Sequence, residues 1–270
     1  VTEPDVVRLA IVGKPNTGKS TLLNHLLGKE KAIVSPTPGT TRDPLSGRIV
    51  FGDTQFEVID TAGIRRRSKV ESDIEYYAVN RAAAALSDAD VGLLVVDASL
   101  GLSEQDKRIS AIAIRRGVAI LVGLSKWDSI SKQPNILSAM IDRIRFQFPI
   151  LSFVPIVPFS GLTGFGAKTL MEKVSNLSSQ LNNIVPTAAL NKAISRWSNE
   201  YIPTVRGREV KIRYATQTSS NPVRFLFFLN TSRNVGSSFR RFLENRIRHE
   251  LGFDEVPVAV EFRASSSKGR

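Results

Sequence analysis

The stretch RLAIVGKPNTGKSTLLNHLL, residues 8–27, constrains the fold more than any other part of the chain. An apolar run leads directly into Gly13, and Gly18, Lys19 and Ser20 complete the pattern G-x-x-x-x-G-K-S before a helical segment. Glycines let such a loop turn so that its backbone N–H groups converge on phosphate oxygens, and the N-terminus of the following helix adds its positive dipole end. The stretch therefore predicts a strand, a phosphate-binding loop and a helix in succession.

Strands and helices alternate through the first two thirds of the chain. Apolar runs predict strands at 8–13, 48–51, 56–61, 91–97, 118–126 and 153–160, and helical patterns lie at 19–27, 76–86, 104–116, 136–148 and 168–181. Nearly continuous apolar runs are typical of strands covered on both faces. We therefore expect an α/β domain, residues 1–181, with a doubly wound, mostly parallel six-stranded sheet that binds its ligand at the carboxyl ends of the strands.

The pattern changes after the polar segment NLSSQLNNIVPT, residues 176–187, which indicates a domain boundary. A helix at 188–201, strands at 209–217 and 223–230, a helix at 237–251 and a strand at 256–263 are expected beyond it. This order predicts a second, small α+β domain, residues 182–270, with helices on one face of a sheet and a disordered tail, ASSSKGR.

Charge is distributed unevenly over these two parts. The formal net charge is +12; Lys and Arg outnumber Asp and Glu by 15 to 7 in residues 186–270, but only by 22 to 18 before them. A basic domain of this kind favours a polyanionic partner, most simply a nucleic acid, although a solvated surface would also be basic. The chain has no cysteine, which excludes disulfides and thiolate metal sites and fits a reducing cytoplasm. An apolar run long enough to span a bilayer is also missing, so we expect no membrane partner.

Two further stretches follow predicted helices or strands and carry polar groups suited to the phosphates and Mg²⁺ of a nucleotide. VIDTAG, residues 58–63, offers Asp60 for the water shell of Mg²⁺ and the Gly63 amide as a sensor of the γ-phosphate. PGTTRD, residues 38–43, offers Thr41, which we prefer to Thr40, to complete the Mg²⁺ shell together with Ser20. Lys19 would reach the β- and γ-phosphates.

The stretches SKWD, residues 125–128, and FSGLTG, residues 159–164, suit a purine base. The carboxylate of Asp128 can accept hydrogen bonds from N1–H and the exocyclic amine of guanine, a donor pair that adenine lacks. The stem of Lys126 can lie along the purine, and Ser160, Gly161 and Leu162 can close over it. These residues predict selection of guanine.

The phosphate loop and the four stretches PGTTRD, VIDTAG, SKWD and FSGLTG follow one another along the chain. In this order they resemble the five signatures of the TRAFAC-class GTPases. GKPNTGKST, PGTTRD, DTAGIRR and the basic domain that follows narrow the resemblance to the EngA/Der family of ribosome-assembly GTPases, over nearly the whole chain. That family carries two tandem GTPase domains and a C-terminal KH-like domain, and the chain resembles the second GTPase domain with the KH-like domain. A first GTPase domain is therefore expected upstream in a longer protein.

The resemblance implies a P-loop GTPase fold, GTP and GDP as ligands, Mg²⁺ as cofactor and slow hydrolysis of GTP. It implies catalytic roles for Lys19, Thr41 and Gly63, and nucleotide-binding roles for further residues of the loop and base signatures: Asn16, Thr17, Gly18, Ser20, Thr21, Ser125, Lys126, Asp128, Ser160, Gly161 and Leu162. It further implies a cytoplasmic monomer that contacts the large ribosomal subunit and its rRNA, with an organelle of bacterial descent left open.

Two positions depart from the family pattern. Ser125 replaces the usual asparagine of N-K-x-D, and Gly161 stands where alanine is more common. A serine hydroxyl can still bond to the loop or the base but is shorter, so guanine selection is expected to survive through Asp128.

A glutamine that orients the attacking water is also absent, because Ile64 follows D-x-x-G. GTPases with an asparagine in the phosphate loop resemble potassium-activated members, so Asn16 is expected to hold K⁺; stabilisation of the turn is the alternative. The stretch IRRRSK, residues 64–69, fits either a switch that meets a partner or a solvated basic loop.

The basic domain lacks the G-x-x-G loop with which ordinary KH domains clamp RNA. The helix at 237–251 carries Arg240, Arg241, Arg246 and Arg248, and packing of its apolar residues is expected to send several of these arginines outward, to contact rRNA, a protein or the neighbouring GTPase domain. Trp197 and the phenylalanines of FLFF, residues 225–228, are expected in the core rather than as base-stacking platforms. His25 and His249 lack metal-ligand spacing.

Two alternatives to a ribosome-assembly GTPase remain from the sequence. A tRNA-modification GTPase shares the asparagine loop and GTTRD, and a module that holds GTP and RNA with negligible turnover would carry the same binding motifs.

Overall fold

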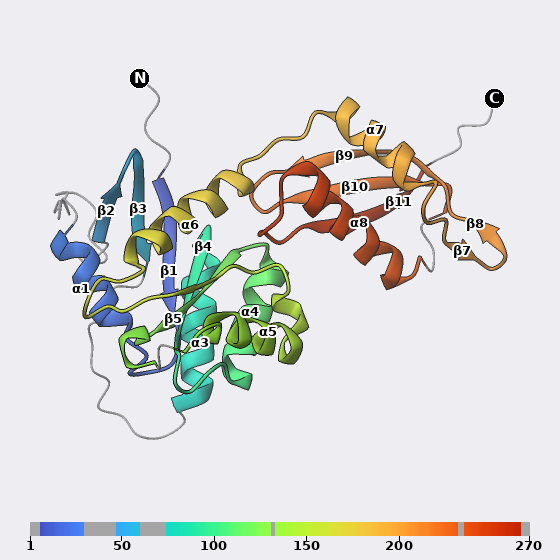
Figure 1. The fold of residues 1–270 in the computed structure, drawn as a ribbon. Helices are drawn as coiled ribbons and strands as arrows, with labels where there is room; N and C mark the ends of the chain where they lie inside the picture. The colour runs from blue at the N-terminus through green and yellow to red at the C-terminus, as the bar shows by residue number, and fades with distance from the viewer. Residues whose placement is uncertain (1–5, 30–46, 60–73, 131–132, 232–234, 266–270) are drawn as a thin grey trace. The chain divides into compact units, whose positions relative to one another are not determined.

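The computed structural model describes residues 6–29, 47–59, 74–130, 133–231 and 235–265. Contacts within the chain divide it into two compact units, residues 1–178 and 179–270 (Figure 1). The division falls inside helix α6, Ala167–Leu181. The predicted tail beyond 265 lies outside the described residues.

The first unit contains a six-stranded sheet in the order β2-β3-β1-β4-β5-β6. Neighbouring strands are parallel except for β2 and β3, which form an antiparallel pair. The predicted mostly parallel, doubly wound sheet is therefore confirmed. Its strands are β1 Val6–Val12, β2 Gly47–Phe51, β3 Thr54–Ile59, β4 Val91–Asp97, β5 Ala119–Ser125 and β6 Ile156–Pro158.

The helices of this unit agree closely with the helical patterns of the sequence. They are α1 Lys19–Lys29, α3 Ile74–Ser87, α4 Glu104–Arg116, α5 Ile136–Gln147 and α6, with short 3-10 turns η1 Trp127–Ser129 and η2 Pro149–Leu151. Helix α4 begins at a capping box in which Ser103 and Asp106 bond to each other's backbone N–H, and it ends at Gly117 in the left-handed conformation, φ 81°. Both of its ends are therefore fixed by local chemistry.

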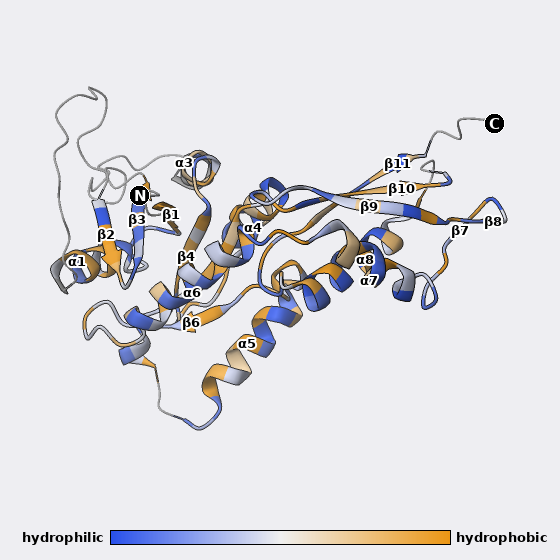
Figure 2. Ribbon diagram, turned by 90° about the horizontal axis from the view of Figure 1, so that it is seen from above, coloured by the Kyte–Doolittle hydropathy of each residue, from blue (hydrophilic) through white to orange (hydrophobic). Residues whose placement is uncertain are grey.

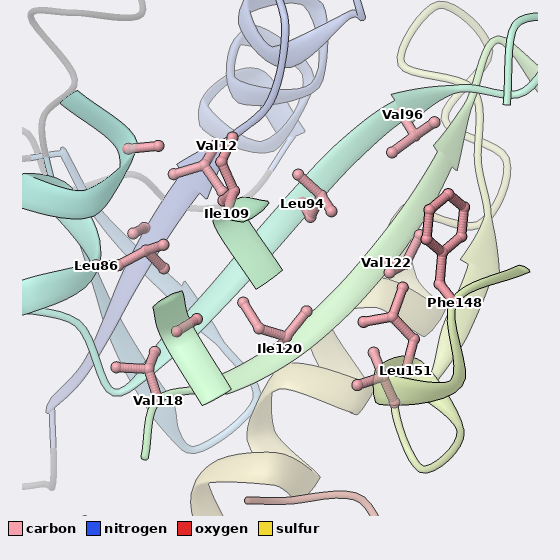
Figure 3. Close-up of a cluster of buried hydrophobic side chains, with 14 of the residues drawn as sticks. Val12, Leu86, Leu94, Val96, Ile109, Val118, Ile120, Val122, Phe148 and Leu151 are labelled. Carbon is pink, nitrogen blue, oxygen red and sulfur yellow. The ribbon is translucent and has the colours of Figure 1, made fainter. Parts of the chain in front are cut away.

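One apolar cluster holds the helices α3, α4 and α5 against the sheet (Figure 3). Alternate residues of the central strands, including Leu94 and Val96 from β4 and Ile120 and Val122 from β5, point into it. Every residue of β4 and β5 is buried, as the continuous apolar runs predicted. The carboxyl ends of these two strands are consequently held rigidly at one edge of the sheet.

The second unit is a three-stranded sheet with two helices. Its elements are α7 Thr187–Trp197, β7 Thr204–Val205, β8 Arg208–Glu209, β9 Ile212–Ser219, β10 Arg224–Leu229, α8 Ser237–Leu251 and β11 Ala259–Ala264. The sheet order is β11-β10-β9, with β11 parallel and β9 antiparallel to the central strand. Figure 2 shows α7 and α8 on the same side of this sheet.

The predicted strand at 209–217 is only partly correct. A two-stranded hairpin, β7 and β8, comes first, and β9 begins at Ile212. Arg206 and Gly207 adopt positive φ, 52° and 74°, and make the tight turn between β7 and β8. A non-glycine residue at positive φ leaves little signal in the sequence, which explains the error.

The four arginines of α8 form two groups, of which one is exposed and the other bonds within the unit. Arg240 and Arg241 are exposed. Arg246 forms ion pairs with Glu250 and Glu200, and the Arg248 guanidinium donates to Asn245 Oδ1 at 2.6 Å. Burial lowers the pKa of Arg248, partly offset by Glu244. Half of the predicted basic surface is therefore engaged within the unit.

The phenylalanines of FLFF do not all lie in the core. Phe225 and Phe227 are buried, and so is Trp197, whose Nε1 donates to Glu250 at 2.9 Å. Phe228 is half-buried and stacks on Tyr214, with ring centroids 4.3 Å apart. The expectation of a core position is wrong for Phe228, because strand alternation turns it to the face opposite Phe227.

We predict that Leu94→Ala lowers the free energy of unfolding of the first unit by about 2–5 kcal/mol, because Leu94 is fully buried among neighbours that cannot collapse into the cavity. Leu100→Ala removes the same atoms from a side chain that is 81% exposed and serves as the control, with a change below about 0.5 kcal/mol. Urea unfolding measures both. Equal effects would show that the core is not where the structure places it.

Candidate functional site

The loop between β1 and α1, residues 13–18, is folded tightly against the end of β4. Gly13 has φ 139°, and a Cβ atom on it would lie 2.3 Å from the carbonyl oxygen of Val95. Gly18 has φ 96°, and Asn16 has φ 62° with an exposed side chain. Only glycine fits the close approach at position 13, which is the reason that the motif begins there.

Lys19 begins α1 and its side chain turns back over this loop. Its Nζ donates to the carbonyl oxygen of Gly13 at 2.9 Å and to that of Lys14. Burial lowers the pKa of Lys19 to about 8, and Asp106 opposes the shift only in part. Lys19 is half-buried and its hydrogen-bond acceptors are neutral, so it is poised to receive an anion, because an anionic oxygen would stabilise its charged form.

Ser125 ties the loop to the sheet. The Ser125 side chain is 1% exposed, and its Oγ lies 2.6 Å from the carbonyl oxygen of Thr17 and 3.0 Å from that of Val96. Thr17 is itself buried and bonds through Oγ1 to the carbonyl oxygen of Lys14 at 2.9 Å. The last residue of β5 therefore fixes the phosphate loop directly.

Lys126 follows in the left-handed conformation, φ 56°, and its position is set by a carboxylate that sequence reasoning missed. Lys126 Nζ lies 2.6 Å from Asp97 Oδ2, and Ser99 donates to Asp97 through both its backbone N–H and its hydroxyl. Burial alone would raise the pKa of Asp97, but these hydrogen bonds hold it below the ordinary value. The sequence does show an aspartate at the carboxyl end of the apolar run VGLLVVD, which could have indicated Asp97 as a site residue.

Asp128 and Ser160 lie beside each other at the ends of β5 and β6. A hydrogen bond from Ser160 lowers the pKa of the exposed Asp128 carboxyl. Ser160 is buried, and its Oγ accepts from the N–H of Thr163 at 3.2 Å. Leu162 is 77% exposed at the tip of this turn. The structure thus brings the predicted base-reading carboxylate together with the segment predicted to close over the base.

A hollow of about 470 Å³ adjoins Asp128. Its lining is mostly apolar and consists of Trp127, Asp128, Ile130, Gln133, Ile136, Thr163 and Phe165. It belongs to the same edge of the sheet as the predicted site.

Several predicted residues lie outside the part of the chain that the structure describes: Thr41, Asp60, Gly63 and the basic stretch 64–69. Their roles stay predictions. Ser20 is exposed in the first turn of α1, and Thr21 is half-buried behind it. Among the described residues, no group of three or more His, Asp or Glu could hold a metal ion, and no helix there could cross a membrane.

Comparison with known proteins matches both units. A family model described as a 50S ribosome-binding GTPase matches residues 8–126. A second, the KH-domain-like domain at the C-terminus of EngA bacterial GTPase enzymes, matches residues 185–263. The chain belongs to the EngA/Der family of GTPases.

Curated relatives named GTPase Der match almost the whole chain. The protein from Treponema pallidum is 42% identical over 98% of this chain and 57% of its own length, and that from Alkaliphilus oremlandii is 40% identical over 98% and 61%. The chain thus spans about three fifths of these relatives. Among solved structures, Era in complex with MgGDPNP and a fragment of 16S ribosomal RNA is 28% identical, covers 97% of this chain and 93% of its own, and has a TM-score of 0.48.

The two departures from the EngA/Der pattern have structural explanations. Ser125 replaces asparagine and directs its hydroxyl to the carbonyls of Thr17 in the loop and Val96 in β4. At Gly161 a Cβ atom would lie 3.0 Å from the Leu22 nitrogen and 3.1 Å from the Thr21 carbonyl carbon, so the turn after β6 packs directly on α1. In this chain an alanine at 161 would require α1 to shift.

His25 packs against the same turn. A Cβ atom on Gly164, φ 80°, would lie 2.3 Å from the His25 ring, so the imidazole fills the space that this glycine leaves. This contact fits the structural role expected for His25.

We predict that the amine of Lys19 titrates with a pKa of about 8, because it is partly desolvated beside neutral carbonyls. The lysine is charged below pH 8 and neutral above it, whereas exposed lysines change near 10.4. A pH titration of ¹³C-labelled lysine side chains by NMR should show one early resonance that is lost in Lys19→Arg. If every lysine titrates above pH 10, Lys19 is not buried as described.

Proposed function

We propose that the chain binds GTP at the edge of the first unit and hydrolyses it to GDP and phosphate, as part of a protein of ribosome assembly. The observation that carries this proposal is the hydrogen bond from Ser125 to Thr17. It joins the phosphate loop to the strand end that presents Asp128, so the phosphate and base subsites form one rigid unit. Membership of the EngA/Der family supports guanine as the base.

The phosphate subsite consists of the loop and the start of α1. Backbone N–H groups of Asn16, Thr17, Gly18, Ser20 and Thr21 receive the phosphate oxygens, together with the helix dipole. When the nucleotide binds, the Lys19 amine leaves the carbonyls of the loop and donates to oxygens of the β- and γ-phosphates. Its pKa then rises, because its partners are anionic.

The base subsite lies at the ends of β5 and β6. Asp128 stays ionised because its pKa is already low, and it accepts from the N1–H and amine of guanine. The Lys126 stem, held by Asp97, lies along the purine. Ser160, Gly161 and Leu162 close over the base, with Gly161 anchored on α1.

Hydrolysis proceeds by direct attack of water on the γ-phosphate. Lys19 stabilises the charge that develops between the β- and γ-phosphates, and Thr41 and Gly63 couple the presence of the γ-phosphate to loop position. The exposed Ser20 hydroxyl at the start of α1 fits a Mg²⁺ ligand, with Thr41 and Asp60 as its partners. The exposed Asn16, held outward at positive φ, fits a K⁺ ligand beside the phosphates. Mg²⁺ and K⁺ supply positive charge to the phosphates when bound.

The second unit completes the assignment. Its KH-like match, together with the excess of Lys and Arg over Asp and Glu, supports contact with rRNA of the large ribosomal subunit and separates this proposal from a tRNA-modification GTPase. We place the protein in the cytoplasm as a monomer, with a first GTPase domain upstream.

Calorimetry of the magnesium-loaded chain with GTP, ATP and xanthosine triphosphate tests the base assignment. Asp128→Asn should weaken GTP binding at least tenfold and favour xanthosine triphosphate, because xanthine carries a carbonyl where guanine carries the amine. Asp142→Asn makes the same charge change at an exposed site on α5 and should bind GTP normally. Equal affinity of the parent chain for GTP and ATP would refute the assignment.

Phosphate release in KCl and in NaCl tests turnover and the role of Asn16 separately. We expect faster release in KCl, and we expect Asn16→Ala to abolish that difference while leaving binding of GDP largely intact. A rate in KCl no faster than spontaneous hydrolysis would identify a binding module instead of an enzyme.

We predict that Ser125→Ala speeds dissociation of a fluorescent GDP analogue about tenfold, because the carbonyl of Thr17 in the phosphate loop loses its hydroxyl donor. Ser110→Ala removes another buried serine hydroxyl, which bonds to the Asp106 carbonyl within α4, and should leave the rate unchanged. Identical rates in the two variants would show that the tie to Thr17 does not hold the nucleotide.

A further inference from the structure

The sheet of the second unit has two different faces. Helices α7 and α8 lie on one side of it (Figure 2), where Phe225, Phe227 and Phe262 pack against residues of α8 and the following turn, such as Phe239 and Phe253. Strand alternation turns Arg224, Leu226 and Phe228 of β10 to the opposite face. This opposite face is called the open face below.

A row of three side chains crosses the open face at one level. Phe228 pairs in register with Tyr214 of β9 and with Arg263 of β11. The rings of Tyr214 and Phe228 stack at 4.3 Å with an interplanar angle of 11°, and Tyr214 is 46% exposed. Arg263 is exposed beside them. A stacked aromatic pair and a guanidinium thus lie in one row across the open face.

The surroundings of this row are polar and mainly basic. Arg224 is exposed at the start of β10, four residues from Phe228 and beyond Leu226, and it pairs with Glu261 at 3.3 Å. Arg213 is exposed next to Tyr214, where a bulge interrupts the pairing of β9 with β10. The unit as a whole carries a strong excess of positive charge. A partner with flat rings and negative charge therefore complements both the aromatic pair and the arginines of the open face.

We propose that the row Tyr214, Phe228 and Arg263 is a stacking platform for single-stranded RNA. A base stacks on the exposed Tyr214 ring, which Phe228 holds flat from behind, and Arg263 neutralises the neighbouring phosphate. The inference rests on the proposed RNA contact of the second unit and locates it. Helix α8 is less suited to this role, because Arg246 and Arg248 are already engaged within the unit.

Fluorescence anisotropy with a labelled, unstructured single-stranded RNA and the 270-residue chain tests the platform. Tyr214→Ala should raise the dissociation constant about tenfold, because one stacked base is lost, whereas Tyr214→Phe should bind like the parent chain. Arg263→Gln should make the logarithm of affinity depend less on the logarithm of salt concentration, by about 0.7 in slope, while Tyr214→Ala leaves the slope unchanged.

Two variants serve as controls. Tyr201→Ala removes a partly exposed ring that packs on Phe239 and Phe242 of the helical side, and Arg208→Gln removes an exposed charge from β8. Both should bind RNA like the parent chain. Tyr214 lies in the second unit and GDP binds in the first, so urea unfolding and circular dichroism of Tyr214→Ala, matched to those of Tyr214→Phe, verify that the second unit is folded.

The outcomes separate the platform from the function on which it rests. If the parent chain binds no RNA at all, the proposed RNA contact of the second unit fails. If the parent binds but Tyr214→Ala matches Tyr201→Ala, the RNA lies elsewhere and the open face takes a different partner, such as a protein. If Tyr214→Phe is as weak as Tyr214→Ala, the hydroxyl and not stacking is responsible, which also overturns the proposal.

Discussion

The candidate site depends on one short contact, between the Ser125 hydroxyl at the end of β5 and the carbonyl oxygen of Thr17 in the phosphate loop. A loop rich in glycine has many accessible conformations, and its N–H groups converge only if something outside the loop holds it. The same hydroxyl also lies within bonding distance of Val96 in β4. Three segments that are far apart in the sequence are thereby fixed to one another by a single buried oxygen.

The rigidity of that contact comes from the sheet beneath it. Strands β4 and β5 are buried along their whole lengths, so their carboxyl ends cannot move independently. Asp97 and Ser125 are register partners at these ends, which places the carboxylate that holds Lys126 beside the hydroxyl that holds the loop. Burial of Lys19 in the same place lowers its pKa, so the site stores an electrostatic cost that a bound polyphosphate would relieve. Hydrophobic packing of the strands therefore fixes the positions of the polar groups at their carboxyl ends.

Sequence alone was sufficient wherever local chemistry decides the structure. The limits of α4 were predicted to the residue, because Ser103, Asp106 and Gly117 define both ends within the helix itself. The phosphate loop was also recognisable from the sequence, because the close approach of Gly13 to the Val95 carbonyl oxygen leaves room only for glycine. In contrast, the role of Asp97 depends on the register between β4 and β5, and the exposure of Phe228 depends on which side of its sheet the helices cover. Both features depend on contacts between segments that are distant in the sequence, and the pattern of one segment does not show which other segment it will contact.

In the second unit, composition alone does not indicate where a polyanion would bind. Fifteen Lys and Arg against seven Asp and Glu suggest a helix that grips phosphate, and α8 carries the densest group of arginines. Yet Arg246 is neutralised by Glu250 and Glu200, and such a pair can meet an external phosphate only by breaking its internal bonds. Of the exposed arginines of the strands, Arg224 is paired with Glu261, whereas Arg263 lies in register with the stacked rings. The net charge of a domain indicates only that its partner is negatively charged. The place of contact depends on which cationic side chains are not already paired within the domain.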